Sequence, residues 1–479
     1  MALAALGVGL LFSPLRSYTY DASIMAEVTR SMLTDGTFRV TGDSWGVNTP
    51  YASYGLGMSL IFVPPYWLAR HLGRDPNTWV TMANAFIFAL TVLAIFWLSV
   101  ACGATRRQGV ITSLLVGFGT LLFPYAVTGL SEPAVGLGIA IGLASLAMAT
   151  RRPVIAGAVA GAAAGFTVIM RTDSLLLVAP ILAVGVWLLG GRRWSVLLAY
   201  AAAAAPWVVV VAAYNALRFG APWRLGYSIP GVDIFNHPIP QGLYGLTLSP
   251  AAGLLCYVPL VLVALIGLPR AARRLPTLTA VAVALLLIRL PVYAHFFSWN
   301  GGGSWGPRYL TPAMPALTLG ILEVVRAFAT LRIPARVAVA AVATLSILVQ
   351  LPGLTVDPGS TRLAAATSQL IPPPSQAAWI AMARPQVEAQ FDHYFFDWRY
   401  SPIQDQADKL LHGSQLMSRY LPHQRPGEVV PAPRKRALLL LGGVFAVGMA
   451  LAWFASSVGP ERVEGIADDV VAEEGQPIR

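Results

Sequence analysis

Charge is scarce in this chain of 479 residues: Asp, Glu, Lys and Arg together make up 11%, whereas hydrophobic residues make up 56%. Soluble domains carry about a quarter charged residues. Lysine is scarcer still, because Lys409 and Lys435 are the only lysines among the 33 basic residues. Hydrophobic runs recur along the whole length. This composition excludes a cytosolic enzyme, a disordered chain and a secreted disulfide scaffold, and it predicts a polytopic membrane protein.

Cysteine and histidine are also few. Cys102 and Cys256 lie at the end of one apolar run and inside another, so neither a disulfide nor a metal site is predicted. The six histidines show no pair at metal-ligand spacing, so no cofactor is identified, and a divalent metal has no pattern to support it. Walker loops, dinucleotide fingerprints and nucleophile elbows are missing too. Nucleotide-sugar chemistry on the cytoplasmic side is therefore unsupported.

The basic residues occur as short arginine pairs between apolar runs and give a net charge of +11. A nucleic-acid-binding protein needs its basic residues clustered on one soluble face. Arginine pairs at the ends of apolar runs are instead typical of membrane topology. Membrane lipids, and no nucleic acid, are the partners that this pattern indicates.

Apolar stretches of about 20 residues, the length needed to cross a bilayer, predict about twelve transmembrane helices. Met1 to Pro14 has no leading basic segment, so we interpret it as a short first span and not as a cleavable signal. The predicted spans are 1–15, 78–101, 108–126, 131–149, 153–170, 174–190, 194–217, 248–268, 277–296, 309–330, 334–352 and 436–456.

One further apolar segment, Tyr54–Ala69, is short and contains Pro64 and Pro65, which interrupt helical hydrogen bonding. The alternation of arginine-rich turns along the chain decides whether this segment crosses the membrane. Twelve arginines and no acid lie in five linkers that fall at alternate turns, which places those linkers in the cytoplasm. Tyr54–Ala69 then lies in the interface, within a long external loop over residues 16–77. The five linkers contain Arg106/Arg107, Arg151/Arg152, Arg192/Arg193, Arg270/Arg273/Arg274 and Arg326/Arg332/Arg336.

Two acids stand out in the predicted external turns. Asp21 precedes apolar positions at four-residue spacing, so it is either the N-cap of a short helix or a catalytic carboxylate near the membrane surface. Glu132 lies between two apolar helices, where an unpaired carboxylate is costly. It is either a first-turn feature of the next helix or the second acid of a site.

Arginines mark the other external positions. Arg171 and Asp173 flank a turn, as a plain interfacial ion pair or as part of a site. Arg308 follows the glycine-rich turn that begins at Trp299, and a guanidinium beside accessible backbone N–H groups suits a phosphate. Arg289 lies inside a predicted span, where an arginine either snorkels or marks a site. In the loop 218–247, aromatic anchoring at the interface explains the tryptophan and the tyrosines.

The order of these motifs resembles the GT-C superfamily of glycosyltransferases, and within it the bacterial relatives of glycosyltransferase family 39. That family includes protein O-mannosyltransferases and lipid A aminoarabinose transferases. The resemblance covers roughly residues 1–330, and the region after about residue 353 matches nothing. It is carried by Tyr20-Asp21, Tyr54-Gly55-Leu56-Gly57, Ser131-Glu132-Pro133, Arg171-Thr172-Asp173, Tyr214-Asn215, Phe219-Gly220-Ala221-Pro222, Gly226-Tyr227, Ser249-Pro250, Gly253-Leu254-Leu255 and Trp299 with Gly306-Pro307-Arg308-Tyr309-Leu310.

The resemblance implies an all-α, GT-C-like transmembrane catalytic domain over residues 1–352. After it, the order of the spans predicts an external region of unknown role over 353–433 and a last helix with an acidic tail over 434–479. It implies that a sugar moves, with inversion, from a polyprenyl-phosphate donor to a glycan, lipid or protein acceptor, on the outer face of a bacterial plasma membrane. Asp21 and Glu132 are the implied catalytic residues. The expected substrate-binding residues are Arg308, Tyr309, Arg171, Asp173, Arg289, Trp305 and Tyr54.

Two other classes remain open from the sequence. A transporter or lipid flippase places polar sites near the bilayer midplane, often in two similar halves. This chain shows no internal repeat, and its ionisable residues avoid mid-span positions apart from Arg289. A non-catalytic scaffold is the third class. The direction of the last span is also open, because basic residues at 434–436 precede it and acids follow it.

Overall fold

The computed structural model describes residues 1–14, 19–41, 50–226, 233–302, 304–356, 358–370 and 385–411. Within these ranges the protein is built from helices, and an isolated β-bridge joins Arg39 and Tyr51. The predicted last span, 436–456, lies outside the described residues, as do all the other residues after 411.

The helices follow one another along the chain in three groups. The first is α1 (Ala2–Phe12), α2 (Tyr20–Thr34), α3 (Leu56–His71), α4 (Pro76–Val80), α5 (Ala83–Ala101), α6 (Arg106–Phe118), η1 (Pro124–Val127) and α7 (Glu132–Ala147). The second is α8 (Pro153–Met170), α9 (Ser174–Leu177), α10 (Ala179–Leu189), α11 (Trp194–Phe219), α12 (Ile239–Thr247), α13 (Leu254–Tyr257), α14 (Leu260–Arg274), α15 (Pro276–Leu287) and α16 (Arg289–His295). The third is η2 (Arg308–Leu317), α17 (Thr318–Ala327), η3 (Phe328–Thr330), α18 (Ile333–Thr355), η4 (Pro358–Ser360), α19 (Arg362–Ser368), α21 (Pro385–Phe396), η5 (Trp398–Tyr400) and α22 (Pro402–Leu411).

The prediction of an all-α polytopic membrane protein is confirmed. Among the described residues, six helical stretches are long and apolar enough to cross a bilayer, and three shorter ones are apolar. Helix is present on each predicted span up to residue 352. The six stretches are Pro76–Ala101, Pro153–Met170, Trp194–Phe219, Pro276–His295, Arg308–Thr330 and Ile333–Thr355, and the shorter ones are Ala2–Phe12, Glu132–Ala147 and Ser174–Leu189.

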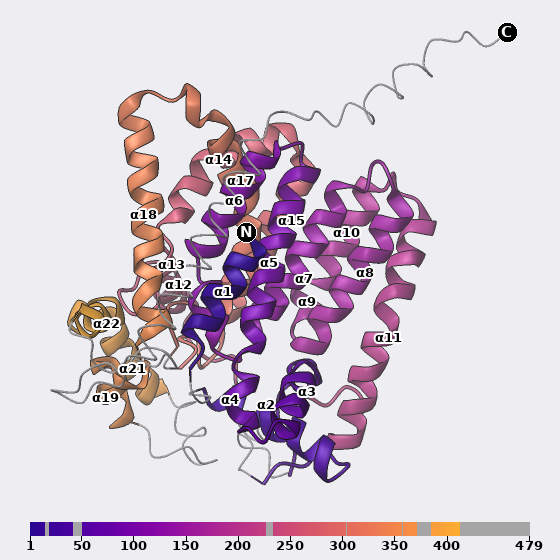
Figure 1. The fold of residues 1–479 in the computed structure, drawn as a ribbon, viewed down its shortest axis with the longest axis vertical. Helices are drawn as coiled ribbons and strands as arrows, with labels where there is room; N and C mark the ends of the chain where they lie inside the picture. The colour runs from indigo at the N-terminus through magenta and orange to yellow at the C-terminus, as the bar shows by residue number, and fades with distance from the viewer. Residues whose placement is uncertain are drawn as a thin grey trace.

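Helix α3 contains the segment that arginine parity placed in the interface. It packs with α2 and α4 at one end of the long helices, the lower end in Figure 1. The expectation that Pro64 and Pro65 interrupt a helix was wrong, because α3 runs through both. Pro64 is exposed and Pro65 is half-buried, so the rings lie away from the packed face that Phe62 and Tyr66 form.

At the opposite end, the linkers that were predicted to be cytoplasmic meet one another. Arg326 donates from Nη2 to the carbonyl oxygen of Cys102 at 2.8 Å, which joins the end of α17 to the turn between α5 and α6. Glu323 pairs with Arg326 and, at 3.5 Å, with Arg274 at the end of α14. Three of the five arginine-bearing linkers therefore lie at one end, as their parity predicts.

Glycines allow α8 to pack closely against α11, which fixes the helix that carries Arg171. A Cβ atom added to Gly161 would lie 2.0 Å from the carbonyl oxygen of Tyr200, and one added to Gly165 would lie 2.3 Å from the Trp207 ring. Such backbone-to-backbone approach through small residues is a common way for membrane helices to associate. The C-terminal end of α8 is thereby held beside the start of α7.

Candidate functional site

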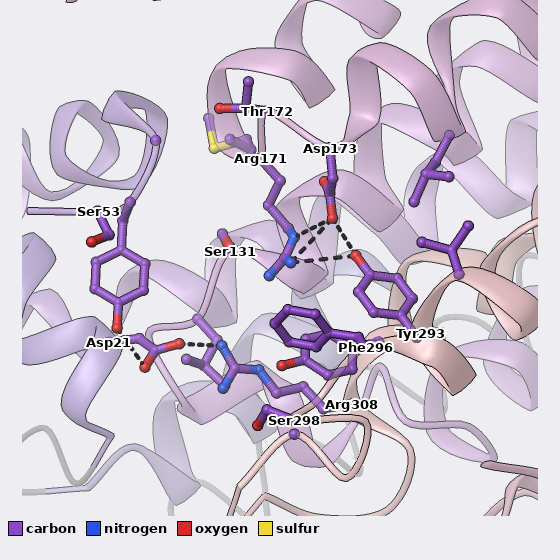
Figure 2. Close-up of a pocket in the computed structure, with 18 of the residues that line it drawn as sticks. Asp21, Ser53, Ser131, Arg171, Thr172, Asp173, Tyr293, Phe296, Ser298 and Arg308 are labelled. Atoms are coloured by element: carbon purple, nitrogen blue, oxygen red, sulfur yellow. Dashed lines mark hydrogen bonds and ion pairs between the residues drawn. The ribbon is translucent and has the colours of Figure 1, made fainter. Parts of the chain in front are cut away.

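Five charged residues from four separate parts of the chain meet at the end of the bundle where α2 and α3 lie. They are Asp21 of α2, Glu132 of α7, Arg171 and Asp173 in the turn after α8, and Arg308 at the start of η2. Figure 2 shows Asp21 facing Arg308 on one side, and Arg171 facing Asp173 and Tyr293 on the other. These five predicted site residues thus form one network of ion pairs.

Asp21 lies in the first turn of α2, but it is not the N-cap. Thr19 occupies that position, and its hydroxyl donates to the carbonyl oxygen of Thr128 at 3.0 Å. The Asp21 carboxylate instead forms an ion pair with Arg308 and accepts a hydrogen bond from the hydroxyl of Tyr54 at 2.9 Å. The capping alternative is therefore wrong, and Asp21 lines the cavity with two partners, Arg308 and Tyr54.

Glu132 connects the two arginines. It is the first residue of α7 after the N-cap Ser131, and its side chain is fully buried. Its Oε1 accepts from Arg171 Nη1 at 2.7 Å and from Arg308 Nε at 2.7 Å, while its Oε2 has no hydrogen-bond partner among the described residues. Glu132 thus lies in the first turn of α7, as one of the two interpretations predicts, and its carboxylate joins the two arginines.

Asp173 completes the second half of the network. Its Oδ2 accepts from Arg171 at 3.1 and 3.2 Å and from the hydroxyl of Tyr293. Burial by itself raises the pKa of the Asp173 carboxyl, but the charges of Arg171 and Arg289 and the hydrogen bonds outweigh burial and hold that pKa below its usual value. Asp173 is therefore ionised at neutral pH.

Tyrosine rings form one wall beside these charges. Tyr293 and Tyr309 are stacked, with ring centroids 4.2 Å apart and an interplanar angle of 2°. The guanidinium carbons of Arg171 and Arg308 lie 5.7 and 5.8 Å from the centroid of the Tyr309 ring, at cation–π distance. Sequence reasoning found Tyr309 but missed Tyr293, because an aromatic residue inside an apolar span carries no signal of its own.

Arg289 is buried in the membrane-spanning stretch 276–295, one turn before Tyr293. None of its three side-chain nitrogens has a hydrogen-bond partner among the described residues, and its side chain is fully buried. Its positive charge lowers the pKa of the Asp173 carboxyl, but Arg289 makes no hydrogen bond to the network. Burying a guanidinium without a partner is costly, so Arg289 is a candidate anion-binding residue.

The glycine-rich turn wraps around Arg308. Gly301, Gly302 and Gly306 adopt positive φ angles of 73°, 71° and 63°. A Cβ atom added to Gly301 would lie 3.0 Å from the Cβ of Arg308, so a larger residue here would push the arginine. In the described part of this turn, the Gly302 N–H donates to Asn300 at 2.9 Å. The glycines thus leave room for the Arg308 guanidinium. The sequence analysis expected them to expose backbone N–H groups to an anion.

A cavity of about 1280 Å³ opens beside the network. One part of its lining is polar and holds Asp21, Tyr54, Arg171, Asp173, Ser304, Trp305, Arg308 and Tyr309. The other part is apolar and comes from α9, α11 and α16, with Leu175, Leu176, Val208, Val211, Ile288 and Val292. A cavity divided in this way suits an amphipathic ligand, with a polar head at the charges and an apolar chain along the helices.

Arg218, at the end of α11, also lines the cavity and was missed by sequence reasoning. It is 6% exposed, and its guanidinium donates to the carbonyl oxygen of Tyr54 at 3.0 Å and to Asn215 Oδ1 at 2.8 Å. It also stacks over the Tyr214 ring at 3.6 Å. The sequence analysis placed Arg218 in the loop 218–247 and gave it no role, whereas the structure places it in the last turn of α11.

Over the described residues, no group of three or more His, Cys, Asp or Glu side chains is arranged to hold a metal ion. The acids of the network are engaged by arginines instead. The network counts three carboxylates against two guanidinium groups, and the nearby Arg289 brings the formal charge to zero. An anion that binds Arg171 or Arg308 therefore competes with the carboxylates that these arginines contact.

Fold and site together define a class: a polytopic helical membrane protein whose buried carboxylate–arginine network borders a half-apolar cavity. No protein-family model matches the sequence, and no curated protein matches it significantly. Among solved structures, the chain is similar to ArnT from Cupriavidus metallidurans in the apo state, at 16% identity over 88% of this chain and 76% of ArnT, with a TM-score of 0.48.

Two further solved structures show comparable likeness. ArnT from Cupriavidus metallidurans bound to undecaprenyl phosphate is 16% identical over 86% of this chain and 77% of ArnT, with a TM-score of 0.44. The archaeal oligosaccharyltransferase AglB from Archaeoglobus fulgidus, in complex with an inhibitory peptide and a dolichol-phosphate, is 12% identical over 84% of this chain, which spans 60% of AglB, with a TM-score of 0.44. These TM-scores are below 0.5, so the function has to follow from this chain's own residues.

Proposed function

We propose that this protein is a membrane glycosyltransferase that moves a sugar from a polyprenyl-phosphate donor to a hydroxyl group of a glycan, lipid or protein acceptor. The observation that carries the proposal is the contact of the cavity-lining Asp21 with Arg308, beside an apolar cavity wall. A carboxylate and an arginine in contact offer a base for the acceptor and a cation for a leaving phosphate. The apolar wall offers a place for a prenyl chain.

The donor binds first in this scheme. Its prenyl chain lies along the apolar lining from α9, α11 and α16, and its phosphate takes Arg308 and Arg171 as partners. Arg308 then turns from the Asp21 carboxylate to the phosphate, which leaves Asp21 free to act. Arg289, buried without a partner in the described structure, adds a third positive charge. Preorganised cations at the leaving phosphate are the largest electrostatic contribution to such a transfer.

The transfer step follows from the place of Asp21. The acceptor oxygen forms a bond to the anomeric carbon while Asp21 takes the hydroxyl proton. The bond between the anomeric carbon and the phosphate oxygen breaks, and its electron pair stays with the phosphate. Attack from the side opposite the phosphate inverts the anomeric centre. Tyr54, whose hydroxyl donates to Asp21 at 2.9 Å, orients the base.

Glu132 takes a different role from the catalytic one that the resemblance implies. It is fully buried and is not among the described residues that line the cavity, and its Oε1 contacts both arginines. A carboxylate in that position holds the two guanidinium groups at a fixed separation. We therefore assign Glu132 as a positioning residue.

The active site faces outward across a bacterial plasma membrane in this proposal. The arginine-bearing linkers meet at the opposite end of the helices, where Arg326 contacts the carbonyl oxygen of Cys102. The positive-inside rule assigns that end to the cytoplasm. A lipid-linked sugar presented on the outer leaflet then reaches the cavity from between the helices.

Labelled polyprenyl-phosphate mannose or arabinose, incubated with the purified protein and membrane extract, tests the proposal. The wild type should form a labelled product, and Asp21→Asn should lower the rate about 10²- to 10⁴-fold because the base is lost. Asp35→Asn, at the exposed end of the same helix, is the matched control and should transfer at the wild-type rate. A wild-type rate in Asp21→Asn contradicts the assignment, and translocation of the sugar lipid in vesicles without any product favours a flippase.

A further inference from the structure

The region after residue 353, which lies beyond the motifs that carry the sequence resemblance, contributes to the wall of the cavity. Gly353 at the end of α18, Gly359 in η4 and Gln406 in α22 are among the lining residues. In Figure 1, α19, α21 and α22 lie beside the lower end of α18, the end of the molecule where α2 and α3 lie. The region is therefore placed where it meets whatever enters the cavity.

Two lining residues have a buried polar atom without a hydrogen-bond partner in the described structure. They are Trp305, whose Nε1 is unpartnered, and Gln406, whose Oε1 is unpartnered. Both side chains are nearly inaccessible, at 5% and 1% exposure. The indole N–H can only donate and the amide oxygen can only accept, so the two atoms are complementary. Leaving both unsatisfied is costly, and a ligand that satisfies both removes that cost.

The position of Gln406 is fixed by its neighbour. Asp405 accepts from the backbone N–H of Arg362 at 2.8 Å and from Lys409 Nζ at 2.9 Å, which fastens α22 to the start of α19. At the beginning of α22, the Ser401 hydroxyl donates to the carbonyl oxygen of Pro250 at 2.9 Å. These contacts hold the helix while the next residue, Gln406, is directed toward the cavity.

Trp305 is held as firmly from the other side. Its ring packs edge-on against Tyr257, with centroids 4.9 Å apart, and its carbonyl oxygen accepts from the Tyr125 hydroxyl at 3.0 Å. A Cβ atom added to Gly353 would lie 2.3 Å from the indole ring, so the end of α18 presses on it directly. Since α22 also packs on α18, both unpartnered groups belong to the surroundings of this one helix.

We infer that Trp305 and Gln406 form a subsite that binds hydroxyl groups of a sugar, and that α22 is thereby part of the substrate-binding site. Hydroxyl groups both donate and accept, so the hydroxyl groups of a sugar can accept from the indole N–H and donate to the amide oxygen. A phosphate matches only the indole, and an ammonium group matches only the amide oxygen. The inference rests on the proposed function, and it specifies the sugar-binding side of the same cavity.

The sugar has two sources, the donor and the acceptor, and kinetics separate them. Gln406→Leu keeps the size of the side chain and removes the acceptor atom, and Trp305→Phe keeps an aromatic ring and removes the donor. Gln404→Leu, at an exposed position one residue before Asp405, is the matched control. With purified full-length protein, we expect each subsite variant to raise one KM about three- to tenfold, the loss of one neutral hydrogen bond. A raised donor KM assigns the subsite to the donor sugar, and a raised acceptor KM assigns it to the acceptor.

Binding of two lipids separates this inference from the proposed function. Polyprenyl phosphate without a sugar should bind to Gln406→Leu as tightly as to the wild type, which also shows that the variant is folded. Polyprenyl-phosphate mannose should bind more weakly if the donor sugar is held there. If both KM values of Gln406→Leu equal those of the wild type, the subsite is overturned while the proposed function stands. If the wild type binds neither lipid and transfers no sugar, the proposed function and the subsite both fall.

Discussion

The two ends of the helical bundle each contain a buried glutamate between two arginines. At the end assigned to the cytoplasm, Glu323 pairs with Arg326 and, at 3.5 Å, with Arg274, whose side chain is 53% exposed. At the other end, Glu132 pairs with Arg171 and Arg308, and both of these arginines line the cavity. The same residue types therefore build a clamp between helices at one end and a ligand-facing network at the other.

The difference lies in what else the arginines contact. Arg326 completes its bonding with the carbonyl oxygen of Cys102, a fixed backbone group. Arg308 and Arg171 contact a second and a third carboxylate, Asp21 and Asp173, whose side chains are 15% and 30% exposed. An arginine that shares charged partners with a cavity can exchange one of them for a ligand. An arginine tied to a carbonyl can only hold helices together.

Glu132→Gln should have the largest effect and should break the outer network completely. One buried carboxylate is removed from between two guanidinium groups, so we expect a loss of about 3–5 kcal/mol in the free energy of unfolding. Transfer should fall below detection as well. Thermal unfolding in detergent, read beside transfer of a labelled sugar, measures both, and a stable, active variant would show that Glu132 is dispensable.

Arg308→Lys sharpens the assignment of the leaving-group cation. Lysine keeps the charge but cannot contact Asp21 and Glu132 with separate nitrogens of a fork. We expect transfer to fall about 10²- to 10³-fold, with a smaller change in thermal stability than for Glu132→Gln. Binding of polyprenyl phosphate to the same variant should weaken. If binding of polyprenyl phosphate is unchanged while transfer is lost, the assignment of the phosphate to Arg308 is contradicted.

Glu323→Gln tests the clamp at the other end. The substitution weakens charge-assisted hydrogen bonds, so the free energy of unfolding should fall by about 1.5–3 kcal/mol. Because this end does not line the cavity, transfer per folded molecule should match the wild type. A fall in transfer per folded molecule as large as that of Arg308→Lys would contradict the distinction between a structural end and a ligand-binding end.

Asp173→Asn should give the smallest effect, a change in how stability depends on pH in the acidic range. The pKa of Asp173 lies below the usual value of 3.8, so the folded state holds the ionised form more strongly than the unfolded chain does. The stability it contributes is complete well above pH 3.8 and is lost as the pH falls through the lower pKa of the folded state. Unfolding temperatures of the wild type and Asp173→Asn should therefore converge on acidification, and parallel curves would refute the linkage.

Sequence reasoning located the network because each of its charges sits in a turn between apolar helices. Parity alone assigns such turns to one side of the membrane, and Asp21, Glu132, Arg171 and Arg308 lie together there in the structure. Parity cannot say which charges touch. The contact of Arg308 with both Asp21 and Glu132 required the packing of η2 against α7, which no short sequence pattern encodes.

Other residues escaped because their surroundings, and not their type, give them a role. Tyr293 lies in an apolar span, and Gln406 lies beyond the motifs that carry the sequence resemblance. Local rules also misled at two places. Thr19 caps α2 in place of Asp21, and α3 runs through Pro64 and Pro65 because its packed face lies on the other side.

One oxygen atom of Glu132 has a consequence for cooperativity. Its Oε1 accepts from Arg171 and Arg308 at the same distance of 2.7 Å, so a shift of either guanidinium changes the field at the other. A ligand that draws Arg308 away strengthens the hold of Glu132 on Arg171, and the reverse is equally true. Under the proposed binding scheme, ligands at Arg308 and at Arg171 would change each other's affinity by one common factor. Glu132 Oε1, the acceptor that Arg308 and Arg171 share, would couple the binding of ligands at these two arginines.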